Sequence, residues 1–490
     1  MERALVKSRP NIIVILADDL GAWAPGCAGN REAVTPNIDR LAAEGTRFDR
    51  FYATSPACSP ARATLLTGMI PSRHGIHDWL SGGNIAAGTD PAIRYLDGTA
   101  TYTQVLAESG YTCGLSGVWH LGDSATPQQG FSHWFTLQDG SGPAVDAPMI
   151  RDGVPLMQPG STADAITDDA LGFMNQHRFD LAPFYLGIHY PCLHVPWPGG
   201  EPHVDPDLDV DFPFASVPRE PIHPWSVGDL AAEPGSPKWR AQLHGYFAAI
   251  TAMDAGIGRI LRRLDDLDIA GDTIVWFLSD HGFNAGHHGV WGAGNGTFPL
   301  NMLDTSLRVP AIVRYPGTIP PGVVRREMLG AYDFAPTLLD GAGLKMPDAE
   351  RLPGRSFACL LDPAQEPDRD HVVVMAEYGP VRMIQTPAWK YVHRFPYGPH
   401  ELYDMTHDPG ERSNLVDDPV RKEIVTLLRG EMQRWFSRYA DPSLDGAHEE
   451  VTGSGQFLRA GTSNDGVLAY GQSRRPARDP AERWLTTDGT

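Results

Sequence analysis

Two apolar runs predict strands that are buried on both faces of a sheet. Residues 11–17 (NIIVILA) and 272–279 (DTIVWFLS) are continuous and rich in β-branched or aromatic residues. Such runs are typical of parallel strands covered by helices. Each run ends in groups that can bind a metal, namely Asp18 and Asp19, and Asp280 and His281. Open α/β sheets bind ligands beyond the carboxyl ends of their strands, so we expect a site here, although one aspartate could instead cap the next segment.

Helical and strand patterns alternate through the first two thirds of the chain. Helices are predicted at 35–45, 102–110, 163–176, 243–267 and 333–343, and further strands at 48–52, 111–117, 184–189 and 307–314. We expect Thr35 to cap the first of these helices and Gly45 to end it. Alternation of this kind predicts an α/β domain with a large sheet and helices on both of its faces.

The pattern changes near residue 370. Short strands are predicted at 372–376, 381–385, 390–394 and 401–405, followed by a helix at 419–439, which together form a small antiparallel α+β unit. We therefore divide the chain into a large domain (1–365), this C-terminal subdomain (366–450) and an extension (451–490). The last residues, 472–490, are expected to be largely disordered. Loops at 79–100 and 197–236, together with the C-terminal subdomain, are predicted to form the wall that faces the substrate.

Composition narrows the class of partner. The chain has 490 residues and a net charge of −20, which argues against nucleic acid or an anionic membrane as partner. An anionic substrate would need a local positive centre such as a metal. The five cysteines show no Cys-x-x-Cys pair, and no apolar core of a signal peptide follows the first ten residues. We therefore expect a cytoplasmic protein.

One cysteine precedes a short helical stretch. Pro60 suits a first helical turn and Gly68 a helix end. Cys58 is thus predicted at a helix N-terminus, where the partial positive charge favours anions and lowers a thiol pKa. Arg62 follows one turn later on the same face, with a guanidinium fork suited to an oxyanion. The alternative is a small buried cysteine beside a surface arginine.

The two strand ends supply three carboxylates and one imidazole. Hard oxygen ligands favour Ca²⁺ or Mg²⁺ over zinc, and the histidine keeps Mn²⁺ open.

The stretch Cys58-Ser59-Pro60-Ala61-Arg62, followed by Leu66-Thr67-Gly68, resembles the signature of the type I sulfatases of the alkaline phosphatase-like superfamily. The resemblance implies an alkaline-phosphatase-like sandwich with a large mixed sheet and a smaller C-terminal subdomain. It implies hydrolysis of a small-molecule or saccharide sulfate ester with release of inorganic sulfate. It also implies that a formylglycine-generating enzyme oxidises Cys58 to formylglycine, whose hydrate is the nucleophile.

Further roles follow from the same resemblance. Asp18, Asp19, Asp280, His281 and the residue made from Cys58 would bind one divalent metal, usually calcium. Arg62 would support the nucleophile. His120, within Trp119-His120-Leu121-Gly122, would hold its second hydroxyl and act as base, and His194, within His194-Val195-Pro196, would face the sulfate as candidate acid. His189 is a weaker rival for that last role.

Two positions depart from the family pattern. The family usually has lysines that clamp the sulfate where this chain has Val118 and Ala293. Each lost charge-assisted hydrogen bond costs on the order of 1.5–3 kcal/mol. The departure keeps two alternatives open, a phosphonate or phosphodiester hydrolase and a weakened, sulfatase-like binding protein. The cations that could substitute are His287, His288, Arg308, Arg382 and Lys390.

Overall fold

The computed structural model describes residues 9–82, 92–191, 193–194, 197, 214–362, 373–461 and 469–471. Its centre is a mixed sheet with the strand order β12-β2-β11-β8-β1-β7-β3-β4-β5-β6. These strands are β1 (Asn11–Ala17), β2 (Thr46–Tyr52), β3 (Thr112–Gly117), β4 (His133–Leu137), β5 (Val145–Arg151), β6 (Val154–Ser161), β7 (Phe184–Tyr190), β8 (Thr273–Ser279), β11 (Arg308–Arg314) and β12 (Val323–Gly330). A short hairpin pairs β9 (Asn284–Ala285) with β10 (Trp291–Gly292).

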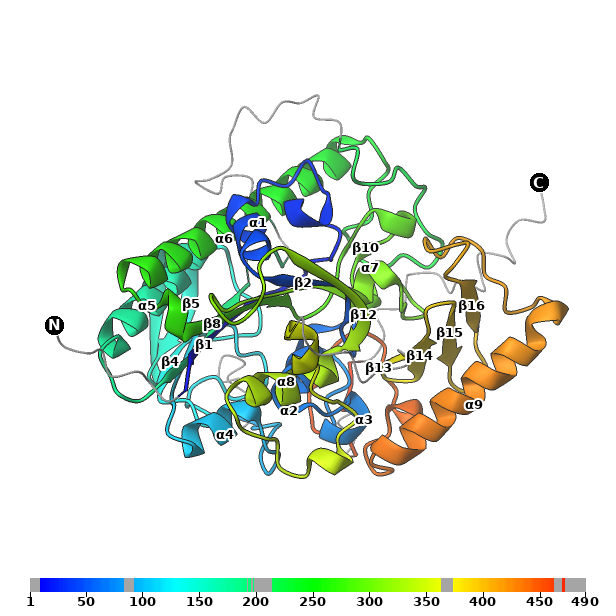
Figure 1. Cartoon of the computed structure of the whole chain (residues 1–490). Helices are drawn as coiled ribbons and strands as arrows, with labels where there is room; N and C mark the ends of the chain where they lie inside the picture. The colour runs from blue at the N-terminus through cyan, green and yellow to red at the C-terminus, as the bar shows by residue number, and fades with distance from the viewer. Residues whose placement is uncertain are drawn as a thin grey trace.

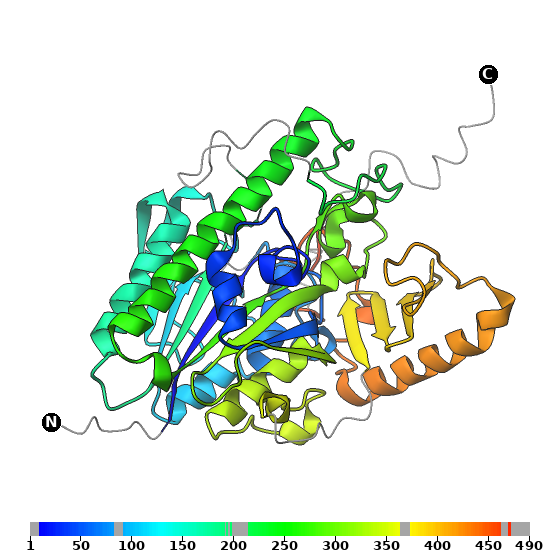
Figure 2. The same ribbon diagram turned by 45° about the horizontal axis from the view of Figure 1, so that its top comes forward.

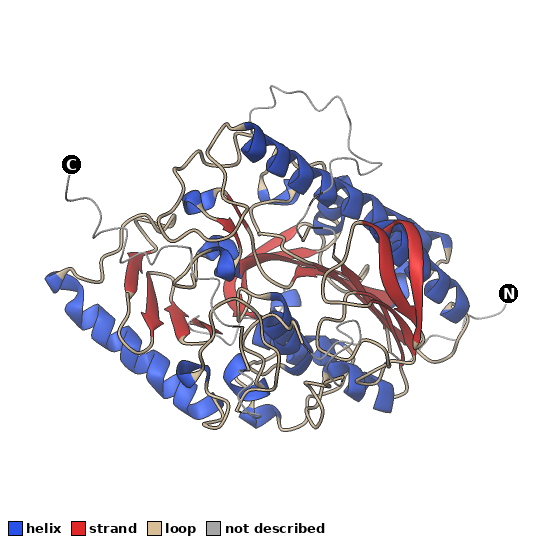
Figure 3. Ribbon diagram, turned by 180° about the vertical axis from the view of Figure 1, so that it is seen from behind, coloured by secondary structure: helices blue, strands red, loops and turns tan. Residues whose placement is uncertain are grey.

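Helices cover both faces of the large sheet (Figures 1 and 2). The helices are α1 (Pro36–Ala43), α2 (Cys58–Thr67), α3 (Pro71–His74), α4 (Tyr102–Glu108), α5 (Thr162–His177), α6 (Pro237–Asp266), α7 (Asp304–Leu307), α8 (Phe334–Gly341) and α9 (Lys422–Tyr439). The view from behind shows the sheet running as one band between the two helical layers (Figure 3). None of the helices in the described part of the chain has the length and apolar character needed to cross a membrane.

Alternation along β1 builds the two cores. Ile13 and Ile15 belong to an apolar cluster with residues of α5 and α6, while Val14 and Leu16 belong to a second cluster with residues of α2, α4 and α8. A strand directs successive side chains to opposite faces, so a run that is apolar at every position requires cover on both. The predicted doubly covered strand is confirmed.

The C-terminal unit is a second, smaller sandwich. Its strands β13 (Val374–Tyr378), β14 (Val381–Gln385), β15 (Trp389–Arg394) and β16 (Glu401–Asp404) form an antiparallel meander. One face packs on α9, and the other packs on residues of the large domain such as Tyr52 and Ala57. The expected architecture of a large mixed sheet plus a small antiparallel sheet is therefore confirmed. The expected boundary at 365/366 falls outside the described residues.

Several local expectations need correction. The sequence pattern does not predict the strands β4, β5, β6 and β12, because their side chains are only partly apolar and their pairing is long-range. Thr35 occupies the N-cap position of α1, but its hydroxyl bonds Gly26 and Asp39 instead of helix amides, and α1 ends before Gly45. The predicted disorder at 472–490 concerns residues outside the described part of the chain.

Candidate active site

Four neighbouring strands deliver the candidate residues to one edge of the sheet. Ala17 of β1 lies opposite Ser279 of β8 in parallel register, so the residues that follow each strand emerge side by side. Asp18 and Asp19 follow β1, and Asp280 and His281 follow β8. The next strands in order, β7 and β3, lead into His194 and His120. The two polar strand ends therefore meet at one edge of the sheet.

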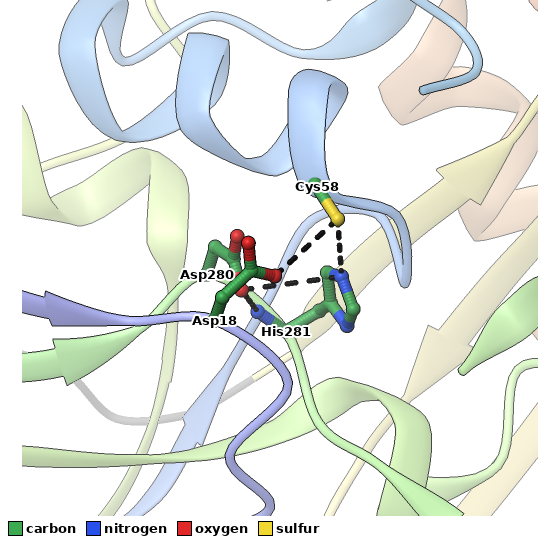
Figure 4. Close-up of side chains that lie close together, drawn as sticks. All are labelled: Asp18, Cys58, Asp280 and His281. Carbon is green, nitrogen blue, oxygen red and sulfur yellow. Dashed lines mark hydrogen bonds and ion pairs between the residues drawn. The ribbon is translucent and has the colours of Figure 1, made fainter. Parts of the chain in front are cut away.

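Cys58 is the first residue of α2, whose N-terminus points at this edge (Figure 4). Its Sγ lies 3.4 Å from Asp18 Oδ1 and 3.2 Å from His281 Nε2. The other ring nitrogen of His281, Nδ1, lies 2.9 Å from the carbonyl oxygen of Gly282, which can only accept. His281 therefore donates from Nδ1 and presents Nε2 to Cys58.

Arg62 closes the cluster from the second turn of α2. Its Nη2 lies 3.2 Å from Asp18 Oδ2 and 2.9 Å from Asp280 Oδ2, and all three side chains are buried. Its Nη1 donates to the carbonyl oxygen of Val118 at 3.4 Å. The alternative of a surface arginine beside Cys58 is wrong, because only 2% of the Arg62 side chain is exposed.

The buried charges do not balance. Burial raises the pKa of Asp19 well above its usual value, and Asp18 and Asp280 raise it further against the opposing charges of His281 and Arg62. The pKa of Asp280 is also raised, by burial and by Asp18, against the opposing effect of Arg62. Burial would raise the pKa of Asp18 too, but the positive charges around it, Arg62 first, outweigh burial and lower it. Three carboxyl groups thus share one permanent cation, Arg62, at the centre of the cluster.

The prediction that the helix N-terminus lowers the pKa of the Cys58 thiol is wrong. Burial raises the pKa of Cys58 well above its usual value, and Asp18, Asp280 and Asp19 add to the rise. The favourable effect of one helix end and of Arg62 is smaller than the penalty of burying a thiolate among three carboxylates. The unmodified cysteine is therefore a protonated thiol and a poor nucleophile.

The same cluster fits a divalent metal ion. Ligand atoms of Asp18, Cys58, Asp280 and His281 all lie within 4.8 Å of one another, and all four residues are buried. Two carboxylates and one imidazole, with unmet negative charge, suit a hard cation that also tolerates nitrogen. Asp19 stands beside this group, with its Oδ1 3.4 Å from Nδ1 of His281.

His120 enters from the loop after β3. Its Nε2 lies 3.1 Å from the carbonyl oxygen of Leu80, so Nε2 carries the proton and Nδ1 keeps its lone pair. Nδ1 is buried without a hydrogen-bond partner among the described residues. Burial and the charge of Arg62 lower the pKa of His120 to about 3, so the ring is neutral. A Cβ on Gly140 would lie 1.9 Å from this ring, so only glycine lets the backbone pack so closely.

His189 and Val118 form the floor behind Arg62. His189 Nδ1 donates to the carbonyl oxygen of Val118 at 2.9 Å, and burial lowers the pKa of His189 to about 3. The turn that makes this possible depends on Gly117, which has φ +116° and would bring a Cβ to 1.9 Å from the His189 carbonyl oxygen. The side chain of Val118 is fully buried and belongs to the apolar cluster beneath α5 and α6.

His194 approaches the cluster from the loop after β7. A positive charge on its ring would lower the pKa of Asp18 and of His120. Its backbone N–H donates to the carbonyl oxygen of Pro191 at 3.0 Å, which turns the chain back toward the site. The other residues of its motif, 195 and 196, lie outside the described part of the chain.

Two of the cations proposed to replace the missing lysines are engaged elsewhere. Lys390 is fully buried and pairs with Asp304 and Glu411, and Arg382 pairs with Asp445. Ala293, which stands where the family usually has a lysine, is buried. The backbone N–H of its neighbour Gly294 donates to the carbonyl oxygen of Pro56, two residues before Cys58.

The sequence pattern missed one part of the site. The amide of Leu80 donates to the hydroxyl of Ser59 at 2.9 Å, and its carbonyl oxygen accepts from His120. Both bonds are made by backbone groups of a loop residue, so no sequence motif predicts them.

Two family models match the chain, and named proteins are similar to it in sequence. The model of the family described as "Sulfatase" matches residues 10–344, and a model described as "N-sulphoglucosamine sulphohydrolase, C-terminal" matches residues 298–437. The chain is 27% identical to the N-acetylglucosamine-6-O-sulfatase of Bacteroides thetaiotaomicron, over 86% of each chain.

Solved structures agree with this likeness. A structure described as a complex with its substrate, D-glucosamine-2-N,6-O-disulfate, superimposes with a TM-score of 0.76 at 25% identity, covering 90% of this chain and all of the other. The phosphonate monoester hydrolase of Agrobacterium radiobacter has a TM-score of 0.63 at 20% identity, covering 88% of this chain and 96% of its own, and thus shares the fold.

Proposed function

Because the chain belongs to the sulfatase family, we propose that this sulfuric ester hydrolase uses a formylglycine made from Cys58 as its nucleophile and binds one divalent metal ion, Ca²⁺. The observation that carries the proposal is the position of Cys58 at the start of α2, enclosed by Asp18, Asp280, His281 and Arg62. Maturation then requires a formylglycine-generating enzyme as a partner.

The proposed metal ligands are Asp18, Asp280 and His281, with Asp19 next to them and position 58 completing the set. When bound, the metal supplies Lewis acidity toward the sulfate group and favours a deprotonated nucleophile. The excess of buried carboxylates over cations supports this assignment, since a divalent ion would offset it.

Conversion of Cys58 to formylglycine would replace a poor nucleophile by a better one. A protonated, buried cysteine is a poor nucleophile, whereas the hydrate of an aldehyde at the same position offers two hydroxyl groups. The raised thiol pKa thus argues that the cysteine itself is a precursor.

The remaining residues have roles that follow from their geometry. Arg62 holds Asp18 and Asp280 in place and directs positive charge at the reacting centre. His120 is neutral and has a free lone pair on Nδ1, so it can accept a proton from a hydroxyl at position 58. His194 follows β7 at the same edge of the sheet and acts electrostatically on Asp18 and His120, and we assign it as the acid that protonates the leaving alcohol.

A sulfated saccharide is the proposed substrate. A relative at 27% identity is named for N-acetylglucosamine 6-sulfate hydrolysis, and a similar solved structure holds a sulfated glucosamine. With a net charge of −20, the protein draws such an anion only through the local positive charge at the metal and Arg62.

One observation supports a second candidate, a phosphonate or phosphodiester hydrolase. The positions where sulfatases usually have clamping lysines are the buried Val118 and Ala293. Without those two cations, the ester cleaved could instead be of the kind named for the phosphonate monoester hydrolase that shares the fold.

Mass spectrometry and a substrate panel test the proposal. The protein is produced in a host that has the maturation enzyme, and the peptide that contains residue 58 is weighed. We expect the mass of formylglycine, and turnover of aryl sulfate and N-acetylglucosamine 6-sulfate ahead of phosphate and phosphonate esters. Cys58→Ala abolishes turnover, while Cys113→Ala, at another buried free cysteine, preserves it. Unmodified cysteine together with no sulfate release contradicts the proposal, and faster phosphonate cleavage supports the second candidate.

A further inference from the structure

The segment after the C-terminal subdomain packs beside the candidate active site. Residues 451–461 and 469–471 lie beyond the ranges that the two family models match, which end at 344 and 437. Val451 and Tyr470 are buried in the same apolar cluster as Ala57, the residue before Cys58. This part of the extension is therefore built into the large domain.

Gln456 is the centre of this contact. Its main chain forms a short parallel bridge with the loop that precedes residue 82, since its N–H donates to Trp79 O at 2.8 Å and its carbonyl oxygen accepts from Ser81 N at 3.0 Å. Its side chain is fully buried. Oε1 accepts from the amide of His77 at 2.8 Å and from that of Asp78 at 3.3 Å.

The amide nitrogen of the same side chain completes the connection. Nε2 of Gln456 donates to the carbonyl oxygen of Gly75 at 3.0 Å and to that of Leu458 at 2.9 Å. Both ends of the side chain are therefore satisfied by backbone groups, which fixes the loop from Gly75 to Ser81 against the extension.

Two further bonds join the same surfaces. Trp79 Nε1 donates to the carbonyl oxygen of Gly453 at 3.1 Å. The amide of Gly455 donates to Asp78 Oδ2 at 3.0 Å, and the hydroxyl of Tyr378 donates to Asp78 Oδ1 at 2.5 Å. The loop is thus held by the extension and by the C-terminal sheet together.

The loop transmits this order to the reacting centre through Leu80. Its amide donates to the hydroxyl of Ser59, the neighbour of Cys58, and its carbonyl oxygen accepts from His120 Nε2. A fixed acceptor at Nε2 keeps the proton on that nitrogen and leaves the lone pair on Nδ1. The tautomer of His120 therefore depends on the position in which the loop holds the carbonyl group of Leu80.

We propose that Gln456 is a positioning residue of the active site, which fixes the tautomer and orientation of His120 by holding Leu80 in place. The proposal rests on the function proposed above for His120. It makes the extension beyond residue 450 a support of the active site, through its bonds to the loop that contains Leu80.

Gln456→Met tests the proposal in the full-length protein. Methionine keeps the length and volume of the side chain and removes its four hydrogen bonds. Removing an outer partner of a catalytic group costs roughly tenfold to a hundredfold in activity, and we expect that loss in kcat for a sulfate ester with KM changed by less than about threefold. The matched control is Gln385→Met, a buried glutamine of β14 that bonds Tyr52 and does not contact the loop.

Two readouts separate positioning from a general loss of stability and need no activity. The ¹⁵N shifts of His120, assigned by loss of its signal in His120→Gln, report which ring nitrogen carries the proton. Hydrogen exchange of the peptide that spans 75–82 reports the order of the loop. We expect Nε2–H in wild type, a mixture of tautomers and exchange about tenfold faster or more in Gln456→Met, and neither change in Gln385→Met.

A milder variant keeps the test decisive if Gln456→Met does not fold. Trp79→Phe keeps an aromatic ring and the side chain of Gln456 and removes the bond to Gly453, so we expect smaller changes in the same direction. Unchanged His120 shifts and unchanged exchange in the folded variants overturn the proposal. If wild type cleaves no sulfate ester while both readouts still shift, the proposed function fails and the positioning role of Gln456 stands.

Discussion

Arg62 and Asp280 are joined by a buried ion pair, with Nη2 of the arginine 2.9 Å from Oδ2 of the aspartate. The same guanidinium holds Asp18 at 3.2 Å, so one side chain of α2 ties together the ends of β1 and β8. Because the three side chains are almost fully buried, removal of the cation leaves charges that water cannot reach.

Arg62→Ala should therefore destabilise the protein by about 3–5 kcal/mol in the presence of a chelator, since it leaves uncompensated buried carboxylates. Urea unfolding measures this free energy. Arg40→Ala is the matched control, because Arg40 also bridges two acids, Glu44 and Asp265, but is more than a third exposed. It should cost about 0–1 kcal/mol. An equal loss of unfolding free energy in the two variants would show that the buried ion pair stabilises the protein no more than the exposed one.

Calcium should stabilise the protein through Asp280. At a calcium concentration about 100 times Kd, the expected gain is about 2.7 kcal/mol in the free energy of unfolding. Asp280→Asn should lose most of that gain at the same concentration, because it removes a charged ligand. Asp254→Asn changes another buried aspartate, which binds amides at the start of α1, and should keep the gain. A calcium gain that survives Asp280→Asn would exclude this residue as a ligand.

Val118→Lys should not restore a sulfate clamp. The side chain of Val118 lies in the apolar cluster, so a lysine there buries an ammonium without a partner and should destabilise the protein by about 2 kcal/mol or more. Thermal unfolding and turnover of aryl sulfate check this. Val118→Ile adds one methylene at the same site and serves as the control for size. A rise in sulfatase activity for the lysine variant would mean that position 118 faces the substrate after all.

The pair Lys390 and Glu411 should make stability depend on pH. Burial raises the pKa of Glu411 to about 7 from 4.5, against the opposing charge of Lys390, and the nearby Asp304 adds to the rise. Between these two values the unfolded chain releases the proton and the folded chain keeps it, so this contribution is full below about pH 4.5 and is lost as the pH rises through 7. The loss is on the order of 3 kcal/mol.

Urea unfolding from pH 4.5 to 8 measures that slope. In Glu411→Gln the group no longer titrates, so the variant should gain stability relative to wild type as the pH rises through this window. Glu401→Gln, at a neighbouring acid that pairs with Arg394, should follow the wild-type slope. A constant difference between wild type and Glu411→Gln across the window would contradict the prediction.

Local sequence was sufficient for the frame of the site. The apolar runs of β1 and β8 fix which segments form central strands, and the polar residues directly after them must then emerge at the same edge. The helix that begins at Cys58 was likewise predictable, because Pro60 and Gly68 mark its ends by backbone preferences alone. In each case the relevant interaction acts over a few residues.

Tertiary structure decided the electrostatics and the supports of the site. The helix end alone favours a thiolate at Cys58, but the sum of burial and three carboxylates raises its pKa instead. Which way Val118 points depends on the packing beneath α5 and α6, and the tautomer of His120 depends on a carbonyl group forty residues away. No local sequence pattern predicts the pKa of Cys58, the direction of the Val118 side chain or the tautomer of His120.

The sequence by itself determined the strands, the helix at Cys58 and the set of chemical groups, because hydrophobic period and backbone preference act locally. The three-dimensional structure alone decided how the charges balance and that Gln456, near the end of the chain, holds Leu80 against His120. Desolvation and long-range hydrogen bonds depend on which distant segments meet, and that is a property of the folded chain as a whole.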